Sequence, residues 1–421
     1  MTLVSVLELH NAKKTHLKDL RKAILVVLTF VLFTIVHLHL CNNWSTFSLQ
    51  FPVISANGSA RLTLKHNRCN IFKGNWVPYA EGPYYYTNSN KCVVDDRQNC
   101  IKFGRPDSGY MKWRWKPDGC ELPRFDAAQF LELVRGKSMV FVGDSVGRNQ
   151  VESLMCLLAT MASPVDAPSV GGAIRCWLYI DYNFKLAIIW SPNLVKLSVP
   201  NQNGSSIVGV LNLYLDKVDE AWAAQIEHFD YVIISAGQWF SRPLIYHENG
   251  KIVGCHVCKN ESITSLSRYY GYRMALRTAF KAILSLPNFK GVTFLRSFSP
   301  THFGGEDWVK GGNCSQTRPF PQQEMESDES NLEFYLTQVD EFRVAEREAG
   351  TRGLKFRWLD ITEAMVMRPD GHPYHYGHPP NKEKHIADCL HWCLPGPIDS
   401  WNEFLLHMLK MEGQESVDAT L

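Results

Sequence analysis

The sequence predicts an α/β protein with a mostly parallel sheet flanked by helices, a smaller disulfide-stapled lobe and a single N-terminal transmembrane helix. Three observations support this prediction. From residue 138 onward, short apolar runs alternate with stretches of helical pattern. Residues 66–135 hold four cysteines and many aromatic side chains, with little helix or strand periodicity. Residues 23–40 contain no Asp, Glu, Lys or Arg.

The composition sets outer limits on the class of protein. The chain has 421 residues, of which 45% are hydrophobic and 20% charged, so it is not disordered throughout. Its 44 basic and 42 acidic side chains leave a net charge of +2. Because there is no basic excess, we expect no nucleic-acid partner.

The N-terminus has the pattern of a signal anchor. Residues 1–22 carry five basic and two acidic side chains and are expected to form a cytoplasmic tail, since positive flanks stay in the cytoplasm. Residues 23–40 are just long enough to cross a bilayer. A cleaved signal peptide is the alternative, but Cys41 and two asparagines stand where its small residues are expected. In either case the rest of the chain, beginning with a polar stem at 41–65, is expected in the secretory lumen.

The cysteines and glycosylation sequons agree with this compartment. Cys41 lies at the predicted membrane edge, and the other eleven cysteines lie in the luminal part, so most of these are expected in disulfides and their odd number leaves one unpaired. A zinc site would need the Cys255-x-x-Cys258 and Cys389/Cys393 pairs in one place, and we favour disulfides. The sequence leaves the pairing open, including that of Cys176, Cys255 and Cys258. Five N-x-S/T sequons predict glycosylated surface loops, at Asn43, Asn57, Asn203, Asn260 and Asn313.

The luminal part divides into a minor lobe at 66–135, a catalytic domain at 136–411 and a C-terminal tail at 412–421. The aromatic side chains of the lobe either stack on sugars or fill a small core. Strands are expected at 138–143, 184–190, 230–235, 291–296 and 354–360. Helices are expected from the end of the first strand to about 159, and at 219–229, 262–285, 332–348 and 398–411. The long loops 299–330 and 368–397 follow strands, where a site is expected.

The end of the first strand suggests a nucleophile. Gly143, Asp144 and Ser145 lie where a helix begins, so the Ser145 hydroxyl would stand above the sheet edge beside helix N–H groups that stabilise an oxyanion. Alternatively, these residues only cap the helix. A serine nucleophile needs an oriented base. Among the 15 histidines, only His391 has an Asp three residues before it, Asp388, although a packed loop histidine is the plainer interpretation of His391 alone.

Two acyl-transfer folds place a serine in this way. Residues 143–147 match the G-x-S-x-G of α/β-hydrolases, but that fold puts several strands before its nucleophile. G-D-S after the first strand, with D-x-x-H near the C-terminus, resembles the GDSL/SGNH hydrolases. Five blocks together resemble the plant trichome-birefringence-like family: GDSVGRNQVESL, SAGQWF (235–240), RSFSPTHF (296–303), GGNC (311–314) and DCLHWCLPGPIDSWNEFLL (388–406).

That resemblance implies an SGNH-like domain in a Golgi polysaccharide O-acetyltransferase, with Ser145, Asp388 and His391 as the triad. It also implies disulfides that tie the lobe to the catalytic domain. The cysteines concerned are Cys69, Cys92, Cys100, Cys120, Cys156, Cys314, Cys389 and Cys393. Residues 236–240 read A-G-Q-W-F where many members have T-G-H-W-W, which is similar to the branch linked to xyloglucan acetylation. We therefore expect galactosyl side chains of xyloglucan as acceptor, with xylan, mannan or pectin as alternatives.

The expected chemistry is acetyl transfer through an acetyl-serine. His391, oriented by Asp388, would deprotonate Ser145, which takes acetyl from a co-substrate such as acetyl-CoA or a derived donor, with no bound cofactor. The expected oxyanion donors are the Ser145 N–H, Gly171 or Gly172, and the Gln238 side chain. The candidates for substrate binding are Arg148, Asn149, Trp239 and Trp392, and packing or capping is the alternative for each.

Four further points concern metals, partners and alternative functions. His372, His375 and His378 suggest a metal, but the Pro and Gly residues among them break any helix that would align them, so we expect none. A membrane partner would supply the acetyl donor to this membrane protein. With water as acceptor, the same triad would be an acetylesterase. A third hypothesis is a lobe that only binds polysaccharide, with Ser145 idle.

Overall fold

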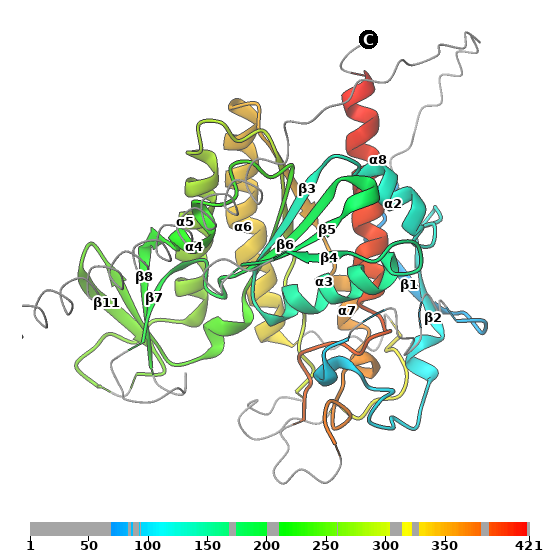
Figure 1. The fold of residues 1–421 in the computed structure, drawn as a ribbon. Coiled ribbons are helices and arrows are strands. Elements are labelled where there is room, and N and C mark those ends of the chain that lie inside the picture. Colours follow the sequence, from blue (N-terminus) through cyan, green and yellow to red (C-terminus); the bar gives the residue numbers. More distant parts are fainter. Residues whose placement is uncertain are drawn as a thin grey trace, which may run out of the picture. The chain divides into compact units, whose positions relative to one another are not determined.

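A seven-stranded sheet lies at the centre of the protein in the computed structural model (Figure 1). The structure describes residues 69–82, 86, 92, 94–167, 174–199, 210–258, 260–303, 314–321, 328–379 and 387–418. In spatial order the strands are β13 (Lys355–Leu359), β12 (Val292–Arg296), β9 (Tyr231–Ser235), β3 (Ser138–Gly143), β6 (Phe184–Trp190), β5 (Ile174–Tyr179) and β4 (Val165–Ala167). The first five run parallel, and β5 and β4 are antiparallel. The predicted α/β fold with a mostly parallel sheet is confirmed.

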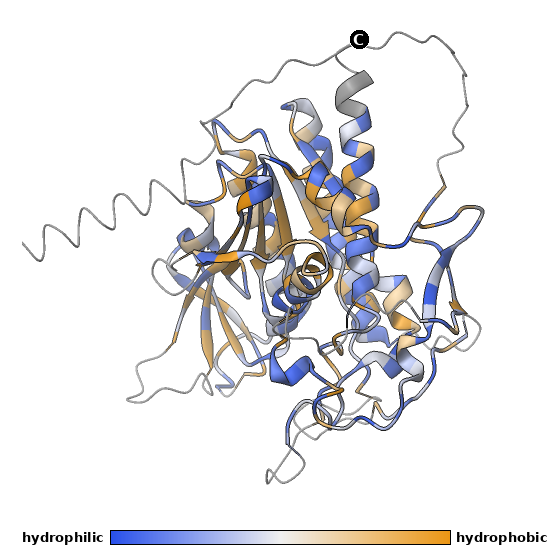
Figure 2. Cartoon of the chain, turned by 45° about the vertical axis from the view of Figure 1, so that its right-hand side comes forward, coloured by the Kyte–Doolittle hydropathy of each residue, from blue (hydrophilic) through white to orange (hydrophobic). Residues whose placement is uncertain are grey.

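Helices cover both faces of this sheet, which explains its apolar strands. Met139, Val140, Phe141 and Val142 of β3 are all fully buried, as expected for a central parallel strand. The helices α2 (Ala127–Leu133), α3 (Ser145–Leu158) and α8 (Asp399–Asp418) contact one another on one face, and α5 (Arg268–Leu284) and α6 (Glu329–Thr351) do so on the other. Figure 2 shows the hydrophobic strands enclosed by these helices.

Several helix boundaries differ from the prediction for local reasons. Only α4 (Glu220–Ala223) forms within 219–229, and α5 begins at Arg268, where Ser267 accepts a hydrogen bond from the backbone N–H of Tyr270. The predicted tail from 412 is also wrong at its start, since α8 continues to Asp418. Glu412 is buried and forms ion pairs with Lys355 and Arg357 of β13.

A four-stranded sheet that we did not predict packs beside α5. It consists of β11 (Lys251–His256), β10 (Leu244–Glu248), β8 (Leu211–Val218) and β7 (Val195–Ser198), in that order. Leu211, Leu213 and Leu215 of β8 are fully buried, whereas the residues between them are partly exposed. This alternation has the period of a strand and was the available sequence signal.

The predicted minor lobe contains a small two-stranded antiparallel sheet. β1 (Gly74–Pro78) pairs with β2 (Trp113–Pro117), and the turns η2 (Asp96–Gln98) and η3 (Gly109–Met111) lie between them in sequence. The lobe and the catalytic part belong to one compact unit, and α2 packs on α3 and α8. The remaining short helices are η4 (Ile180–Tyr182), η5 (Gln238–Ser241), α7 (Thr362–Val366) and η8 (Pro369–Gly371).

The described residues form five disulfides, two of which join the lobe to the catalytic part. All eight cysteines that the resemblance implied are bonded, as Cys69–Cys120, Cys92–Cys156, Cys100–Cys393 and Cys314–Cys389. The second and third tie the lobe to α3 and to the segment before α8. Cys255 and Cys258 form the fifth, and the buried Cys176 is the one described cysteine outside these bonds.

Some predictions fall outside the described residues. These are the cytoplasmic tail, the transmembrane segment at 23–40, the stem, four of the five sequons, and Gly171 and Gly172. Asn260, the remaining sequon asparagine, is exposed. In the part of the chain that the structure describes, no helix is both long enough and apolar enough to cross a membrane.

Candidate active site

The strand-to-helix turn after β3 presents Ser145 at the carboxyl edge of the sheet. Asp144 caps α3 by accepting hydrogen bonds from the backbone N–H groups of Val146 (3.0 Å) and Gly147 (3.4 Å). Two glycines allow the turn to lie tightly against β9. A Cβ on Gly143 would stand 1.7 Å from the carbonyl oxygen of Ser235, and one on Gly147 would stand 3.0 Å from the Ser235 hydroxyl. Ser145 is thus the first helical residue and remains partly exposed.

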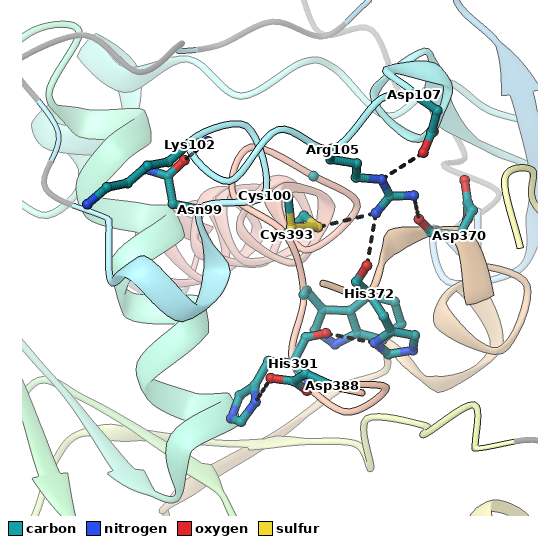
Figure 3. The surroundings of a disulfide bond; sticks show 12 residues. Asn99, Cys100, Lys102, Arg105, Asp107, Asp370, His372, Asp388, His391 and Cys393 are labelled. Atoms are coloured by element: carbon teal, nitrogen blue, oxygen red, sulfur yellow. Dashed lines mark hydrogen bonds and ion pairs between the residues drawn. A yellow bond between two sulfur atoms is a disulfide. The ribbon is translucent and has the colours of Figure 1, made fainter. Parts of the chain in front are cut away.

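His391 and Asp388 complete a continuous chain of hydrogen bonds to Ser145. His391 Nε2 lies 2.8 Å from Ser145 Oγ, and its Nδ1 lies 2.8 Å from Asp388 Oδ2. The other carboxylate oxygen, Oδ1, accepts from the backbone N–H groups of Leu390 and His391. Figure 3 shows Asp388 turned toward His391. The structure therefore brings together the three residues predicted as nucleophile, base and orienter. Ser145 and His391 are 246 residues apart in the sequence.

The charges of this trio suit general-base chemistry. Burial raises the pKa of Asp388, but the His391 ring and two backbone N–H groups outweigh it and hold that pKa well below its usual range. Burial likewise lowers the pKa of His391, but Asp388 outweighs it and raises the pKa overall. Asp388 is therefore ionised, and its charge makes His391 a stronger base toward the Ser145 hydroxyl.

The loop that carries His391 is fixed at several points. In sequence, His391 lies between Cys389 and Cys393, which form disulfides with Cys314 and Cys100. Figure 3 shows the Cys100–Cys393 bond. Tyr374 and Asp388 exchange backbone hydrogen bonds of 2.9 Å in both directions. The base is thus held between covalent bonds, as pre-organised catalysis requires.

Two predicted substrate-binding residues instead belong to this support. Asn149 is fully buried: its Oδ1 accepts from the Trp392 N–H at 2.8 Å, and its Nδ2 donates to the Trp392 carbonyl at 3.2 Å. Trp392 is also fully buried and stacks on His372 with ring centroids 4.1 Å apart. Because neither side chain reaches the surface, the predicted substrate roles of Asn149 and Trp392 are wrong.

We expect Asn149→Ala to lower kcat about tenfold or more while leaving KM for the acceptor unchanged. The substitution leaves buried polar groups of Trp392 unpaired, which costs about 1–3 kcal/mol and loosens the neighbouring His391. Steady-state kinetics on this variant, beside Asn288→Ala at an exposed position, test the assignment. A raised KM with unchanged kcat would instead support the predicted role of Asn149 in substrate binding.

Arg148 lies in a charged group between α3 and η2. Its Nε is 3.7 Å from Glu152 Oε1 on the next helical turn, and Arg97 pairs with Asp95 at 2.6 Å. Burial and the charge of Asp95 raise the pKa of Glu152 to about 7, against the pull of Arg148. Arg148 keeps a 24% exposed side chain, so its predicted contact with substrate stays a prediction.

Glu152→Gln is expected to stabilise the protein above neutral pH. The folded-state pKa near 7 exceeds the ordinary value of 4.5, so the fold disfavours the carboxylate. This penalty is absent below about pH 4.5, grows as the pH rises and reaches about 3 kcal/mol above pH 7. Denaturant unfolding should show the variant gaining far more stability over wild type at pH 8 than at pH 5. An equal difference at both values would contradict the buried-acid interpretation.

The oxyanion donors are only partly described. The Ser145 N–H stands at the N-terminus of α3, as predicted, whereas Gly172 is outside the described residues. Gln238 approaches through its backbone, since its N–H lies 3.4 Å from Asp144 Oδ2. Its side-chain Nε2 donates to the Ser299 carbonyl at 2.7 Å, which directs that amide group toward the loop after β12. Gln238 therefore contacts the cap of the nucleophile helix rather than presenting a free amide.

A pocket of about 680 Å³ has Trp239 in its wall. Most of its lining is polar or aromatic, as with Trp239, Arg242, Arg268, Tyr269 and Phe298, and it also includes the aliphatic Leu390. Leu390 directly precedes His391. Trp239 is partly exposed, packs edge-to-face on Trp190 at 5.6 Å and lies under the Arg242 guanidinium at 4.0 Å. Of the two tryptophans predicted as sugar platforms, Trp239 alone has an accessible ring.

Sequence reasoning missed several residues that shape this site. The charge of Arg97, from the minor lobe, lowers the pKa of His391 and so acts against Asp388. Arg296, buried at the end of β12, donates to the Ser235 hydroxyl beside the nucleophile turn. An arginine that ends an apolar strand was a signal for the second, whereas no local pattern marked the first.

Comparison with known families decides which fold carries this site. A model described as the GDSL/SGNH-like acyl-esterase family found in Pmr5 and Cas1p matches residues 122–408, a range that contains Ser145, Asp388 and His391. The chain belongs to this family. A model of the PMR5 N-terminal domain matches residues 67–121, immediately before it.

Named relatives of this acyl-esterase family member align along most of their length. Protein trichome birefringence-like 19 of Arabidopsis thaliana is 51% identical over 351 residues, which is 82% of each chain. Xyloglucan O-acetyltransferase 4 of Populus trichocarpa is 44% identical over 82% of each chain, and xyloglucan O-acetyltransferase 1 of Arabidopsis thaliana is 39% identical over 81% of this chain and 80% of that one. The predicted resemblance to trichome-birefringence-like proteins is confirmed, and the chain is an enzyme of the acyltransferase and esterase class.

Among solved structures, a small COPII coat GTPase from Encephalitozoon cuniculi aligns with 69% of this chain and 90% of its own at 11% identity. Its TM-score of 0.27 is too low to indicate a shared fold.

Proposed function

We propose that this enzyme transfers acetyl groups to a plant cell-wall polysaccharide through an acetyl-Ser145 intermediate, with xyloglucan as the acceptor. The observation that supports it most directly is the 2.8 Å contact between His391 Nε2 and Ser145 Oγ, with Asp388 behind the base. Relatives named xyloglucan O-acetyltransferases, at 39–44% identity, support the choice of acceptor.

The mechanism follows from the order of these atoms. His391 Nε2 takes the proton of Ser145 Oγ as the oxygen attacks the acetyl carbonyl of the donor. The bond to the leaving group breaks, and His391 returns the proton to that group. A sugar hydroxyl then gives its proton to His391 and attacks the acetyl-serine. Ser145 Oγ leaves and regains the proton, so the enzyme ends as it began.

The donor enters this scheme as a co-substrate, acetyl-CoA or a derived donor, and a membrane partner supplies it on the luminal side. We place the enzyme in the Golgi membrane as a single-pass type II protein. The support for a luminal catalytic domain is the basic flank before residues 23–40, the five disulfides and the exposed sequon at Asn260.

The pocket beside Leu390 is the proposed place of the acceptor sugar. An aromatic ring at its wall, with hydroxyl and guanidinium groups around it, suits the apolar face and the hydroxyl edge of a pyranose. We therefore expect Trp239→Ala to raise KM for the acceptor about tenfold while kcat for accepted substrate changes little. Trp358→Ala, on the far edge strand β13, is the matched control. An unchanged KM in the Trp239 variant would contradict the placement of the acceptor in this pocket.

The acceptor is identified by offering several polymers in separate reactions. The full chain from a glycosylating host is incubated with an acetyl donor and separate deacetylated xyloglucan, xylan, mannan and pectin oligosaccharides, and mass spectrometry detects added acetyl groups. We expect acetylation of xyloglucan, lost in Ser145→Ala. Acetylation of another polymer would contradict xyloglucan as the acceptor but leave the proposed acetyl transfer in place.

An acetylesterase is the second candidate, because the matching family is described as acyl-esterases and water can take the place of the sugar hydroxyl. Ser145-dependent release of acetate from native oligosaccharides, with no transfer to any polymer, would favour it.

A further inference from the structure

Two histidines behind the triad form a hydrogen-bonded pair that the mechanism does not use. His302, in the loop after β12, and His372, after η8, meet through His302 Nδ1 and His372 Nε2 at 2.7 Å. The outer nitrogens both contact backbone carbonyls. His302 Nε2 lies 2.9 Å from the Val366 oxygen, and His372 Nδ1 lies 2.7 Å from the oxygen of His391 itself. Figure 3 shows His372 directed at that carbonyl, on the opposite side of His391 from the Asp388 contact.

These contacts fix the positions of the ring protons. A carbonyl oxygen only accepts hydrogen bonds, so His302 must carry a proton on Nε2 and His372 must carry one on Nδ1. If both rings were neutral, the inner nitrogens would then be two bare lone pairs facing each other at 2.7 Å. That contact is a hydrogen bond only if a third proton lies between them.

We propose that His302 and His372 share one proton and that this charged dyad positions the backbone of His391 for catalysis. The assignment deepens the proposed function, because it rests on His391 being the base. His302 and His372 are positioning residues, since they reach the reacting atoms only through the His391 carbonyl. The stacking of His372 on Trp392, whose backbone is held by Asn149, fixes the ring plane that aims Nδ1 at this oxygen.

Burial opposes positive charge at this site. His372 is 1% exposed, and burial lowers the pKa of both rings, that of His302 to about 4, so burial excludes two charges near neutral pH and disfavours even one. The third proton is required by geometry, because both outer nitrogens face carbonyl oxygens while the inner nitrogens face each other. A shared proton satisfies both inner nitrogens at once and belongs to the pair. The carboxylates that favour this charge are Asp370 and Asp328 toward His302, and Asp388 toward His372.

The cations near the dyad have partners of their own. Arg368 is paired with Asp370, and Arg105 donates to the carbonyls of Asp370 and His372 and to the Asp107 carboxylate. The His391 ring also disfavours a charge on His372. The His391 nitrogen that accepts a proton in the reaction, Nε2, faces Ser145.

The proton count is tested directly by nitrogen NMR. The full chain, labelled with ¹⁵N-histidine, is recorded at pH 7, and the two rings are assigned from the signals lost in His302→Gln and His372→Gln. We expect N–H protons on His302 Nε2 and His372 Nδ1 and a third shared by the inner nitrogens. Two protons on these four nitrogens, or a proton on His372 Nε2 with none on Nδ1, would overturn the proposal. This readout needs no activity, so it stands even if the proposed acceptor is wrong.

The positioning role is tested by a rescue experiment. A glutamine at 302 carries two N–H groups on one nitrogen and can serve the Val366 oxygen and His372 Nε2 without charge, whereas leucine supplies none. We expect His302→Leu to lower kcat about tenfold to a hundredfold at unchanged KM, and His302→Gln to retain activity within about threefold of wild type. His375→Leu, at an exposed position in the same segment, is the control and should be silent.

Equal loss of kcat in the Leu and Gln variants would overturn the positioning role, and so would wild-type kcat in His302→Leu. Any Ser145-dependent turnover, transfer or hydrolysis, serves as the assay. If His302→Leu does not fold, the NMR result on the wild-type chain still decides the shared proton.

Discussion

Ser145→Ala should lower the rate of acetyl transfer by on the order of 10⁴-fold or more, with the fold intact. The hydroxyl is the only part of the side chain removed, and it makes one described hydrogen bond, to His391. Without it no acetyl-serine forms, and the residual rate reflects binding and any oxyanion donors alone. The measurement is kcat/KM for the accepted polymer, together with an unfolding curve that shows unchanged stability.

Two further variants make this result specific. Ser285→Ala, at the exposed C-terminal end of α5, should behave as wild type. Adding His391→Ala to Ser145→Ala should cause almost no additional loss, because a nucleophile and its base act as one unit. Losses that multiply in the double variant would mean that Ser145 and His391 act in separate steps.

Removal of the Cys100–Cys393 disulfide should cost about 5 kcal/mol of unfolding free energy. The bond joins residues 293 apart, so its loss releases a very long loop in the unfolded chain. Cys393 is also two residues after His391, so kcat should fall in Cys100→Ala/Cys393→Ala even under conditions where the protein is folded. Denaturant unfolding and steady-state kinetics on the double variant measure the two effects.

The matched control is Cys255→Ala/Cys258→Ala. This pair lies only three residues apart and away from the triad loop, so its loss should cost about 2 kcal/mol or less and leave kcat unchanged. Equal stability losses in the two double variants would contradict an effect that depends on loop length.

The nucleophile and the sheet around it were predictable because their signals are local. An apolar run before Gly143-Asp-Ser gives a buried strand that ends at a cap, and a sheet of parallel strands then places each carboxyl end at one edge. The D-x-x-H spacing was also local, since an Asp at that distance accepts hydrogen bonds from both the ring and the backbone of its histidine.

The substrate roles of Asn149 and Trp392 were mispredicted because proximity in sequence says nothing about direction. Both flank site residues, yet Asn149 points from α3 into the protein and binds the backbone of Trp392, 243 residues away. The contributions of Arg97 and His302 depend in the same way on contacts between distant segments. The sheet of β7, β8, β10 and β11, by contrast, carried a readable alternation in residues 211–215.

The central claim is that acetyl passes through Ser145, and a rapid-quench experiment tests it most directly. The full chain is mixed with an isotopically labelled acetyl donor without acceptor, quenched in acid, digested and analysed by mass spectrometry. The account predicts one labelled acetyl group on the Ser145 peptide, which disappears when deacetylated xyloglucan is added before the quench and is absent from Ser145→Ala. Labelled polysaccharide formed at full rate with no label on Ser145 would contradict it.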